Sequence, residues 1–346
     1  MKLIPHSMPL LGAAEERAAV AALRSGYLSE GPRVEAFERA VARTLGRSGA
    51  VAASSGTGAL VLALHALQAG RGDEVVIPSY VCSALLDAVN AVGASPVVVD
   101  VDEADLNISP AEVARAVGRK TRAVIVPHIF GNPAAARQIA ALGVPVIEDL
   151  AQCVKAERGG RAVGAVGRCA VLSFYATKLL TTGYGGMLVS SDRRLLARAR
   201  DLRAFDNRDA YEPRPHVALS ELAAAVGLVQ WRRLDAFIRR RRALARRYDC
   251  VAGDFAVRPI GRGVYYRYLI RAPQGAEKAI RAFRKLGVEA KRPVHLPLHR
   301  YVRLSPGRFP VTEKAFRAVV SVPLYPALTE PQVRRILSAL KKVVRR

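Results

Sequence analysis

The chain has 346 residues, 51% of them hydrophobic, which is enough for one large and one smaller domain with buried cores and excludes a disordered protein. The sequence contains no run of eighteen apolar residues and no signal peptide, so we expect a cytoplasmic protein with no membrane partner. The net charge of +25 lies mostly in residues 232–346, which contain 29 lysines and arginines and 7 acidic residues.

Short runs rich in β-branched residues alternate with alanine-rich helical stretches over the first 190 residues. The runs are GAVAAS, DEVVIPS, SPVVVDV, RAVIVPHIFG, VPVIED, CAVLSFYA and GGMLVSS. Strands separated by helices predict crossover connections, and therefore an α/β domain with a mostly parallel seven-stranded sheet flanked by helices. Ligands bind such sheets at the carboxyl ends of the strands.

From about residue 240 the pattern becomes that of a smaller α+β unit. A long basic helix precedes a strand in VYYRYLIRAP, a helix in AEKAIRAFRKLG and a closing helix in EPQVRRILSALKKVVRR. We therefore predict a large domain over residues 1–240 and a small C-terminal domain over residues 241–346.

The basic helix includes FIRRRRALARRYD, in which Phe237, Leu244 and Tyr248 recur at helical spacing. This spacing favours a single helix with a solvated basic face. The alternative is a surface that attracts anions, either a phosphorylated small substrate or nucleic acid.

A first polar motif, SGTGAL, follows the first predicted strand and opens a helix. Gly56 and Thr57 stand at the helix N-terminus, where free N–H groups and the helix dipole favour an anion such as phosphate. The hydroxyls of Ser55 and Thr57 are extra donors. An ordinary N-cap followed by a turn explains the same residues, so the motif alone leaves both interpretations open.

Two further motifs follow later strands. Glu148 and Asp149 end the strand in VPVIED, and their side chains must point to opposite faces of the sheet. If Asp149 is buried it requires a cation or a strong donor; the alternative is that it only caps the next helix. Lys178, in SFYATKLLTTGYGGM, has three interpretations: a surface charge, a contact to phosphate, or an amine that forms a Schiff base. A phosphate cradle, an acid for a pyridinium nitrogen and a lysine for an aldehyde are together what pyridoxal phosphate requires.

The order and spacing of these segments, over roughly residues 8–340, resemble the DegT/DnrJ/StrS sugar aminotransferases, which are pyridoxal phosphate enzymes of fold type I. The resemblance is carried by GYLSEGPRVEAFERAVA, SGTGALVLALHAL, GDEVVIPSYVCSALLDAV, VDVDEADLNISP, IEDLAQC, SFYATKLLTTGYGGMLV, ALSELAAAVGLVQWRRLD and VSVPLYPALTE. It implies a homodimer with active sites at the subunit interface. It also implies transfer of an amino group, usually from glutamate, to a keto sugar carried on a nucleoside diphosphate.

The resemblance also implies roles for single residues. Lys178 matches the lysine that forms the Schiff base with the cofactor and moves the proton during transamination. Asp149 matches the partner of the pyridine nitrogen, and Gln152 the donor to the phenolic oxygen. The residues that match the phosphate ligands are Gly56, Thr57 and Ser173.

Three departures from the family pattern concern the cofactor ring and the substrate. Cys82 stands where an aromatic residue usually stacks on the ring, so we expect Cys82 to pack there, with Tyr80 as the alternative. His216 replaces an asparagine that reaches the partner's phosphate, and Tyr184 replaces an acid in the substrate pocket. A branch that dehydrates sugars has histidine in place of the lysine, so Lys178 argues against dehydration.

The remaining histidines give weaker expectations. His128 in VPHIFGNP makes either a structural hydrogen bond or a catalytic contact. His295 and His299 lie in a loop near the substrate in relatives; without a third ligand we expect no metal there. The alternatives to sugar amination are a dehydratase, a transaminase for a cyclitol or aminohydroxybenzoate precursor, and a regulatory nucleic-acid-binding protein on a degenerate scaffold. We do not expect the last, because the cofactor residues are kept together.

Overall fold

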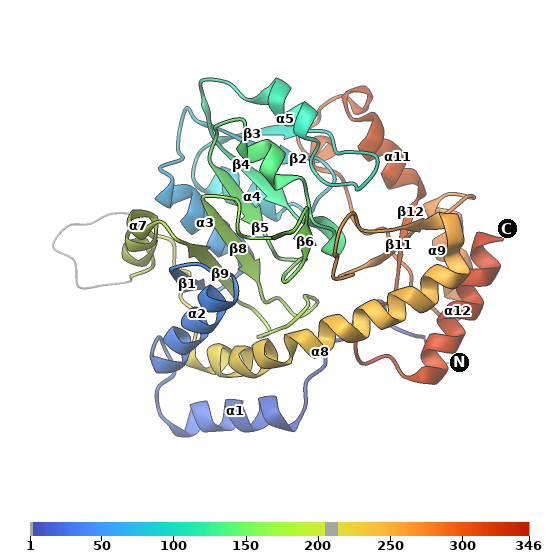
Figure 1. Cartoon of the computed structure of the whole chain (residues 1–346), viewed down its shortest axis with the longest axis horizontal. Coiled ribbons are helices and arrows are strands. Elements are labelled where there is room, and N and C mark those ends of the chain that lie inside the picture. The colour runs from blue at the N-terminus through green and yellow to red at the C-terminus, as the bar shows by residue number, and fades with distance from the viewer. Residues whose placement is uncertain (1–2, 205–213, 346) are drawn as a thin grey trace.

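The computed structural model describes residues 3–204 and 214–345, and its centre is a sheet of seven strands in the order β1-β9-β8-β5-β4-β2-β3 (Figure 1). The strands are β1 (Gly49–Ala53), β2 (Glu74–Pro78), β3 (Ser95–Val99), β4 (Thr121–Pro127), β5 (Val146–Asp149), β8 (Cys169–Ser173) and β9 (Gly186–Ser190). All neighbouring pairs are parallel except those of β9. Each predicted run therefore forms a strand, and the expected mostly parallel sheet is confirmed.

Helices cover both faces of this sheet because side chains alternate along each strand. In β1, Val51 and Ala53 pack in one core, whereas Ala50 and Ala52 pack in another. The first core contains α3 (Gly56–Ala66), α4 (Ala84–Ala91) and α7 (Arg193–Arg203). The opposite face carries α2 (Pro32–Thr44), α5 (Pro110–Ala116), α6 (Ala136–Ala140) and α8 (Glu221–Ala252).

A separate core belongs to the smaller antiparallel sheet, which has the order β10-β11-β12. Its elements are β10 (Ala256–Val257), β11 (Tyr268–Arg271), α9 (Ala276–Lys285), β12 (Val319–Val322) and α12 (Glu330–Val344). Ile4, near the N-terminus, lies in this core and bridges to Val288. The remaining elements are α1 (Ala13–Arg24), the hairpin of β6 (Glu157–Arg158) and β7 (Arg161–Ala162), α10 (Leu298–Tyr301) and α11 (Pro310–Ala318).

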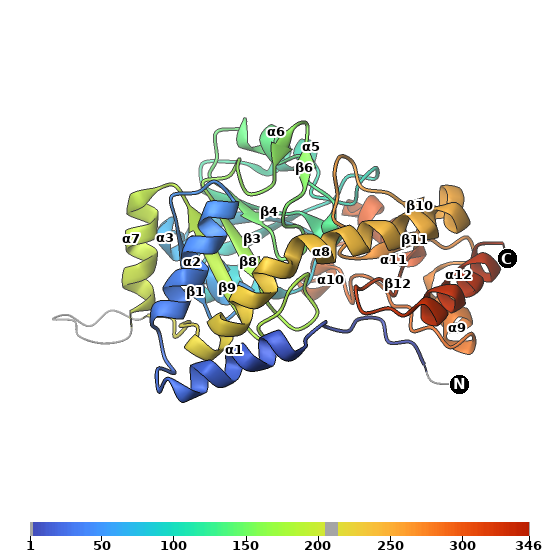
Figure 2. The same cartoon turned by 60° about the horizontal axis from the view of Figure 1, so that its bottom comes forward.

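The helix α8 connects the two sheets without a break (Figure 2). Residue 240 therefore lies in the middle of a helix and not in a linker, and the division into domains at this position stays a prediction. Among residues 3–204 and 214–345, no helix has the length and apolarity needed to cross a bilayer.

The prediction of a solvated basic face on α8 is wrong for Arg241, which is buried. Its Nη1 donates to the carbonyls of Leu324 at 2.7 Å, Tyr266 at 3.2 Å and Tyr265 at 3.4 Å. The reason is its position: Arg241 stands four residues after Phe237, on the helix face that packs against the small unit. Its neighbour Arg242 also donates to a carbonyl, that of Gly263.

Candidate active site

The turn between β1 and α3 forms a cradle at the carboxyl end of β8 and the amino end of the antiparallel strand β9. Ser55 is the N-cap of α3, and its Oγ accepts a hydrogen bond from the Gly58 N–H at 2.9 Å. A Cβ on Gly56 would lie 2.7 Å from the Cβ of Ser173, and a Cβ on Gly186 would lie 2.1 Å from the Ser55 carbonyl oxygen. Only glycine fits at both places, because the turn passes directly over the two strand ends. The first N–H groups of α3 therefore point into a space where an anion can bind.

Asp149 ends β5 on the face of the sheet that carries α3. Ile147, two residues earlier, packs in the core with α3, whereas Val146 packs on the other side. Oδ1 of Asp149 accepts a hydrogen bond from Ala151 N at 2.9 Å, and no other described residue donates to this carboxylate. Burial raises the pKa of Asp149, and the charge of Lys178 partly opposes this shift. A protonated ring nitrogen is a cationic donor of the kind that this buried carboxylate needs.

Gln152, three residues after Asp149, has its side-chain amide oriented by a backbone hydrogen bond. Its Oε1 accepts a hydrogen bond from the Phe130 N–H at 2.6 Å, which fixes the oxygen on that side. The nitrogen is then the donor available to a ligand, which suits a phenolic oxygen.

Lys178 lies in a tightly bonded loop that follows β8. Its backbone N–H donates to the Tyr175 carbonyl at 2.9 Å, and Thr182 N donates to the Phe174 carbonyl at 3.0 Å. The Nζ of Lys178 lies 5.6 Å from the ring centre of Tyr266, which stands two residues before β11 of the smaller sheet. The loop thus holds the amine at the boundary between the two sheets, beside Asp149.

Cys82 and Tyr80 differ in what they offer to a ligand. Loss of solvation beside the surrounding protein raises the pKa of the Cys82 thiol. The charge of Lys178 lowers this pKa and the charge of Asp149 raises it, so both residues are close to Cys82. The Cys82 side chain is exposed, as ring packing requires. Tyr80 is only 1% exposed and packs edge-on against Phe130, with ring centres 5.9 Å apart. The core encloses the ring of Tyr80, which argues for Cys82 at the cofactor ring, and a role for Tyr80 toward the cofactor or the substrate stays a prediction.

Three further predicted substrate residues are exposed. Tyr184 is 69% exposed and lies edge-on to Tyr175 in the loop of Lys178. His216 precedes Val217, whose carbonyl accepts a hydrogen bond from Ser54 N at 2.6 Å, so this segment lies beside the cradle. His295 stands in the loop before α10. Their roles toward substrate stay predictions.

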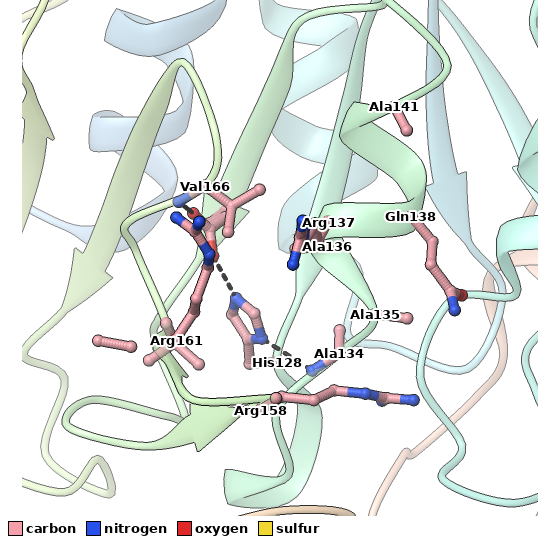
Figure 3. Close-up of a pocket in the computed structure, with 14 residues that line it drawn as sticks. His128, Ala134, Ala135, Ala136, Arg137, Gln138, Ala141, Arg158, Arg161 and Val166 are labelled. Atoms are coloured by element: carbon pink, nitrogen blue, oxygen red, sulfur yellow. Dashed lines mark hydrogen bonds and ion pairs between the residues drawn. The ribbon is translucent and has the colours of Figure 1, made fainter.

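His128 makes structural hydrogen bonds, one of them from its backbone N–H to the Asp149 carbonyl at 3.0 Å. Its Nδ1 accepts from Ala134 N at 2.9 Å, so Nε2 carries the proton and donates to Glu148 at 3.0 Å (Figure 3). Both side chains line a cavity of about 370 Å³ between α6 and the β6–β7 hairpin. Glu148 and Asp149 point to opposite faces, as predicted, so this cavity lies behind the sheet as seen from Lys178.

His299 is also structural: it bonds Ser79 Oγ at 2.6 Å and Glu313 Oε1 at 3.2 Å, and it stacks on Phe309. Within the described parts of the chain, no three His, Cys, Asp or Glu side chains are placed to hold a metal ion.

Three residues of this region have no signal in the sequence: Tyr266, which lies against Lys178, and Arg267 and His6, which are joined to Tyr266 by hydrogen bonds. Tyr266 is buried against Lys178, and its hydroxyl accepts a hydrogen bond from Arg267 Nη2 at 3.1 Å. Arg267 Nη1 in turn bonds His6 Nδ1 at 2.9 Å. Tyr266 and Arg267 stand in the predicted strand VYYRYLIRAP, where alternation of polar and apolar residues gave no sign of a contact with residue 6 or 178.

The chain is similar in sequence and fold to known proteins. The model of the DegT/DnrJ/EryC1/StrS aminotransferase family matches residues 9–341. The spore coat polysaccharide biosynthesis protein SpsC of Bacillus subtilis (strain 168) is 32% identical, over 99% of this chain and 97% of the relative. The aminotransferase TlmJ from Streptoalloteichus hindustanus has a TM-score of 0.92 and 34% identity, over 99% of both chains. DesV of S. venezuelae has a TM-score of 0.90 and 32% identity, over 96% of this chain and 94% of the other.

Proposed function

Because the chain belongs to the DegT/DnrJ/EryC1/StrS aminotransferase family, we propose that it moves the amino group of glutamate to a keto sugar carried on a nucleotide. The chain is a sugar aminotransferase, and its cofactor is pyridoxal phosphate. The donor, the acceptor and the nucleotide are the proposed part. The observation that carries the proposal is the placement of Lys178, Asp149 and the glycine cradle at the carboxyl ends of neighbouring strands.

The residues of this site fit the parts of the cofactor one by one. Gly56, Thr57 and Ser173 would hold the phosphate, since the cradle leaves N–H groups of α3 without partners. Asp149 would pair with the ring nitrogen and keep it protonated. Gln152 would donate to the phenolic oxygen. Cys82 would pack on the ring, because its exposed thiol is beside both Asp149 and Lys178.

The chain's own groups then carry the proton transfers. Bound pyridoxal phosphate supplies an aldehyde for the amino group and a ring that accepts electrons from the substrate carbon. Lys178 would hold the cofactor's aldehyde carbon, and its Nζ, once free, would move the proton between the substrate carbon and the neighbouring position. Asp149 would keep the ring nitrogen charged in both halves of a ping-pong cycle.

The name of one relative supports a keto sugar as the acceptor: SpsC is a spore coat polysaccharide biosynthesis protein. Lys178 argues against dehydration. A panel of keto substrates separates a nucleotide-linked sugar from a cyclitol or an aminohydroxybenzoate precursor. Tight DNA binding at physiological salt by cofactor-free protein would instead favour the regulatory alternative. A cytoplasmic location stays a prediction from the sequence.

We also propose that the protein works as a homodimer. Large apolar side chains are exposed at the N-terminal end and in the loop of Lys178, which suits a surface covered by a second copy. These residues are Leu11, Val20, Leu23, Tyr27, Leu28, Tyr175 and Tyr184. A sedimentation equilibrium experiment tests the dimer directly, with a monomer as the contradicting result.

The function is tested with purified protein, pyridoxal phosphate, glutamate and nucleotide-linked keto sugars. We expect 2-oxoglutarate and an amino sugar as products, and visible absorbance from the cofactor bound to Lys178. Lys178→Ala should lose both the visible absorbance and all turnover. Lys314→Ala is the matched control, since this lysine pairs with Glu103 on the surface. Turnover retained by Lys178→Ala would remove the lysine from its central role.

A further inference from the structure

Arg267 carries a positive charge that no acidic side chain among residues 3–204 and 214–345 neutralises. Its guanidinium bonds His6 Nδ1 and the Tyr266 hydroxyl, at 2.9 and 3.1 Å, and forms no ion pair with any carboxylate in the described part of the chain. Burial and the charges of Arg267 and Lys291 lower the pKa of His6 to about 2, so His6 is a neutral acceptor. Arginine has five N–H donors, and these two bonds leave three for a ligand.

The guanidinium lies close to the catalytic amine. Lys178 Nζ is 5.6 Å and Arg267 Cζ is 4.6 Å from the same Tyr266 ring centre, so the two atoms are at most about 10 Å apart. The neighbouring Arg241 adds a third cation. Burial raises the pKa of the Tyr266 phenol, but the charges of Lys178 and Arg267, a hydrogen bond with Thr177 and the charge of Arg241 together lower it by more, so its net shift is downward. The boundary between the two sheets is therefore positive and suited to an anion.

His6 fixes the guanidinium before any ligand arrives. Ile4 N donates to the Gly287 carbonyl at 3.0 Å, and Glu289 N donates to the Ile4 carbonyl at 3.0 Å, so the N-terminal segment is bound to the small unit. His6 N donates to Glu289 Oε2 at 2.8 Å, and its ring bonds Ser321 Oγ at 2.9 Å. A cation held in this way loses little conformational freedom on binding a ligand.

We propose that Arg267 binds a carboxylate of the amino donor and so positions the donor's amine beside Lys178. This inference rests on the proposed function. A planar guanidinium matches a carboxylate with two parallel hydrogen bonds. The amine and the distal carboxylate carbon of extended glutamate are about 5 Å apart by standard bond lengths, which lies within the upper limit of about 10 Å on the distance between Lys178 Nζ and Arg267 Cζ. The half-buried guanidinium and the Tyr266 ring together offer a charged end and an apolar wall for such a chain.

The test compares Arg267→Met with Arg271→Met in the cofactor-loaded enzyme. Arg271 lies four residues further along, at the end of β11, and donates to the exposed Glu103 carbonyl, so its loss removes the same charge at a distance. Binding of glutarate, a dicarboxylate that lacks the amine, is measured by calorimetry. We expect glutarate affinity to fall at least about 10-fold in Arg267→Met and less than about 2-fold in Arg271→Met.

Single half-reactions followed by cofactor absorbance identify the anion. We expect conversion by glutamate to slow in Arg267→Met, while return by the keto sugar stays close to that of the wild type. Equal loss in both halves would overturn the proposal and assign the guanidinium to the sugar's diphosphate. Unchanged glutarate affinity, or a wild type that does not bind glutarate, would also overturn it.

Arg267→Lys keeps the charge without the planar fork and serves where the methionine variant fails to fold; we expect glutarate affinity about 3- to 10-fold weaker than in the wild type. Affinity equal to the wild type in this variant would contradict a two-bond contact. The proposed function fails separately, when the wild type aminates no keto sugar although it binds glutarate.

Discussion

Replacing Glu148 by glutamine should destabilise the protein strongly, because this buried carboxylate accepts four hydrogen bonds. Its donors are His128 Nε2 at 3.0 Å and the N–H groups of Gly164, Val166 and Gly167 at 2.7–2.8 Å. Burial alone would raise the pKa of Glu148, but His128 and the backbone donors lower it to about 2. An amide in the same place turns an NH2 group toward N–H donors, so at least one of them loses its acceptor.

The size of the effect follows from the two pKa values. A fall from about 4.5 in the unfolded chain to about 2 in the folded one corresponds to about 3 kcal/mol, at 1.36 kcal/mol for each pH unit. A lowered carboxyl pKa stabilises the fold above the unfolded value. The contribution is therefore complete above about pH 4.5 and is lost as the pH falls toward about 2.

Urea unfolding at a series of pH values measures this contribution as the difference between wild type and Glu148→Gln. We expect a difference of about 3 kcal/mol at pH 7 that shrinks below about pH 4.5. Glu330→Gln is the control, because the Glu330 carboxylate pairs with Arg247 on the surface and its loss should have a small effect. A difference below about 1 kcal/mol at pH 7, or one that is constant with pH, would refute this account of Glu148.

Three other substitutions test the site and its support. Asp149→Asn should retain the cofactor but slow each half-reaction on the order of 100-fold, measured by stopped-flow absorbance; an unchanged rate would contradict a role at the ring nitrogen. Gly186→Ala would place a Cβ 2.1 Å from the Ser55 oxygen, so cofactor affinity should fall and unfolding free energy drop by about 1–3 kcal/mol, whereas Gly118→Ala, with open space around it, should change neither. Arg241→Met should lower unfolding free energy by about 3 kcal/mol and the exposed Arg239→Met by little, and equal effects would show that the three carbonyl contacts of Arg241 contribute nothing.

The sequence predicts the sheet and the strand-end residues well because both depend on local patterns. Each strand is short, rich in β-branched residues and bounded by glycine or polar turns, and a parallel sheet brings its carboxyl ends to one edge. The strand pattern alone therefore predicts that Asp149, Lys178 and the α3 cradle lie near one another. Period-two alternation also placed Glu148 and Asp149 on opposite faces correctly.

The contacts that sequence could not predict join segments far apart in the chain. Arg267 and His6 are separated by 261 residues, and only the docking of the N-terminal segment on the small unit brings them together. Arg241 stands within four consecutive arginines, and composition alone favours solvent for all of them. Its burial depends on carbonyls just before β11 and just after β12, which have no sequence signature.

The two acids at the end of β5 show how one strand separates stability from chemistry. Glu148 has four donors, so its charge is fully satisfied by the fold and nothing remains for a ligand. Asp149, one residue later, has a single donor, and burial raises its pKa. A carboxylate left under-satisfied in a buried position is retained where a ligand completes its hydrogen bonds. The contrast between these neighbours is therefore the local reason to place the cofactor's ring nitrogen on the α3 face and not in the cavity beside His128.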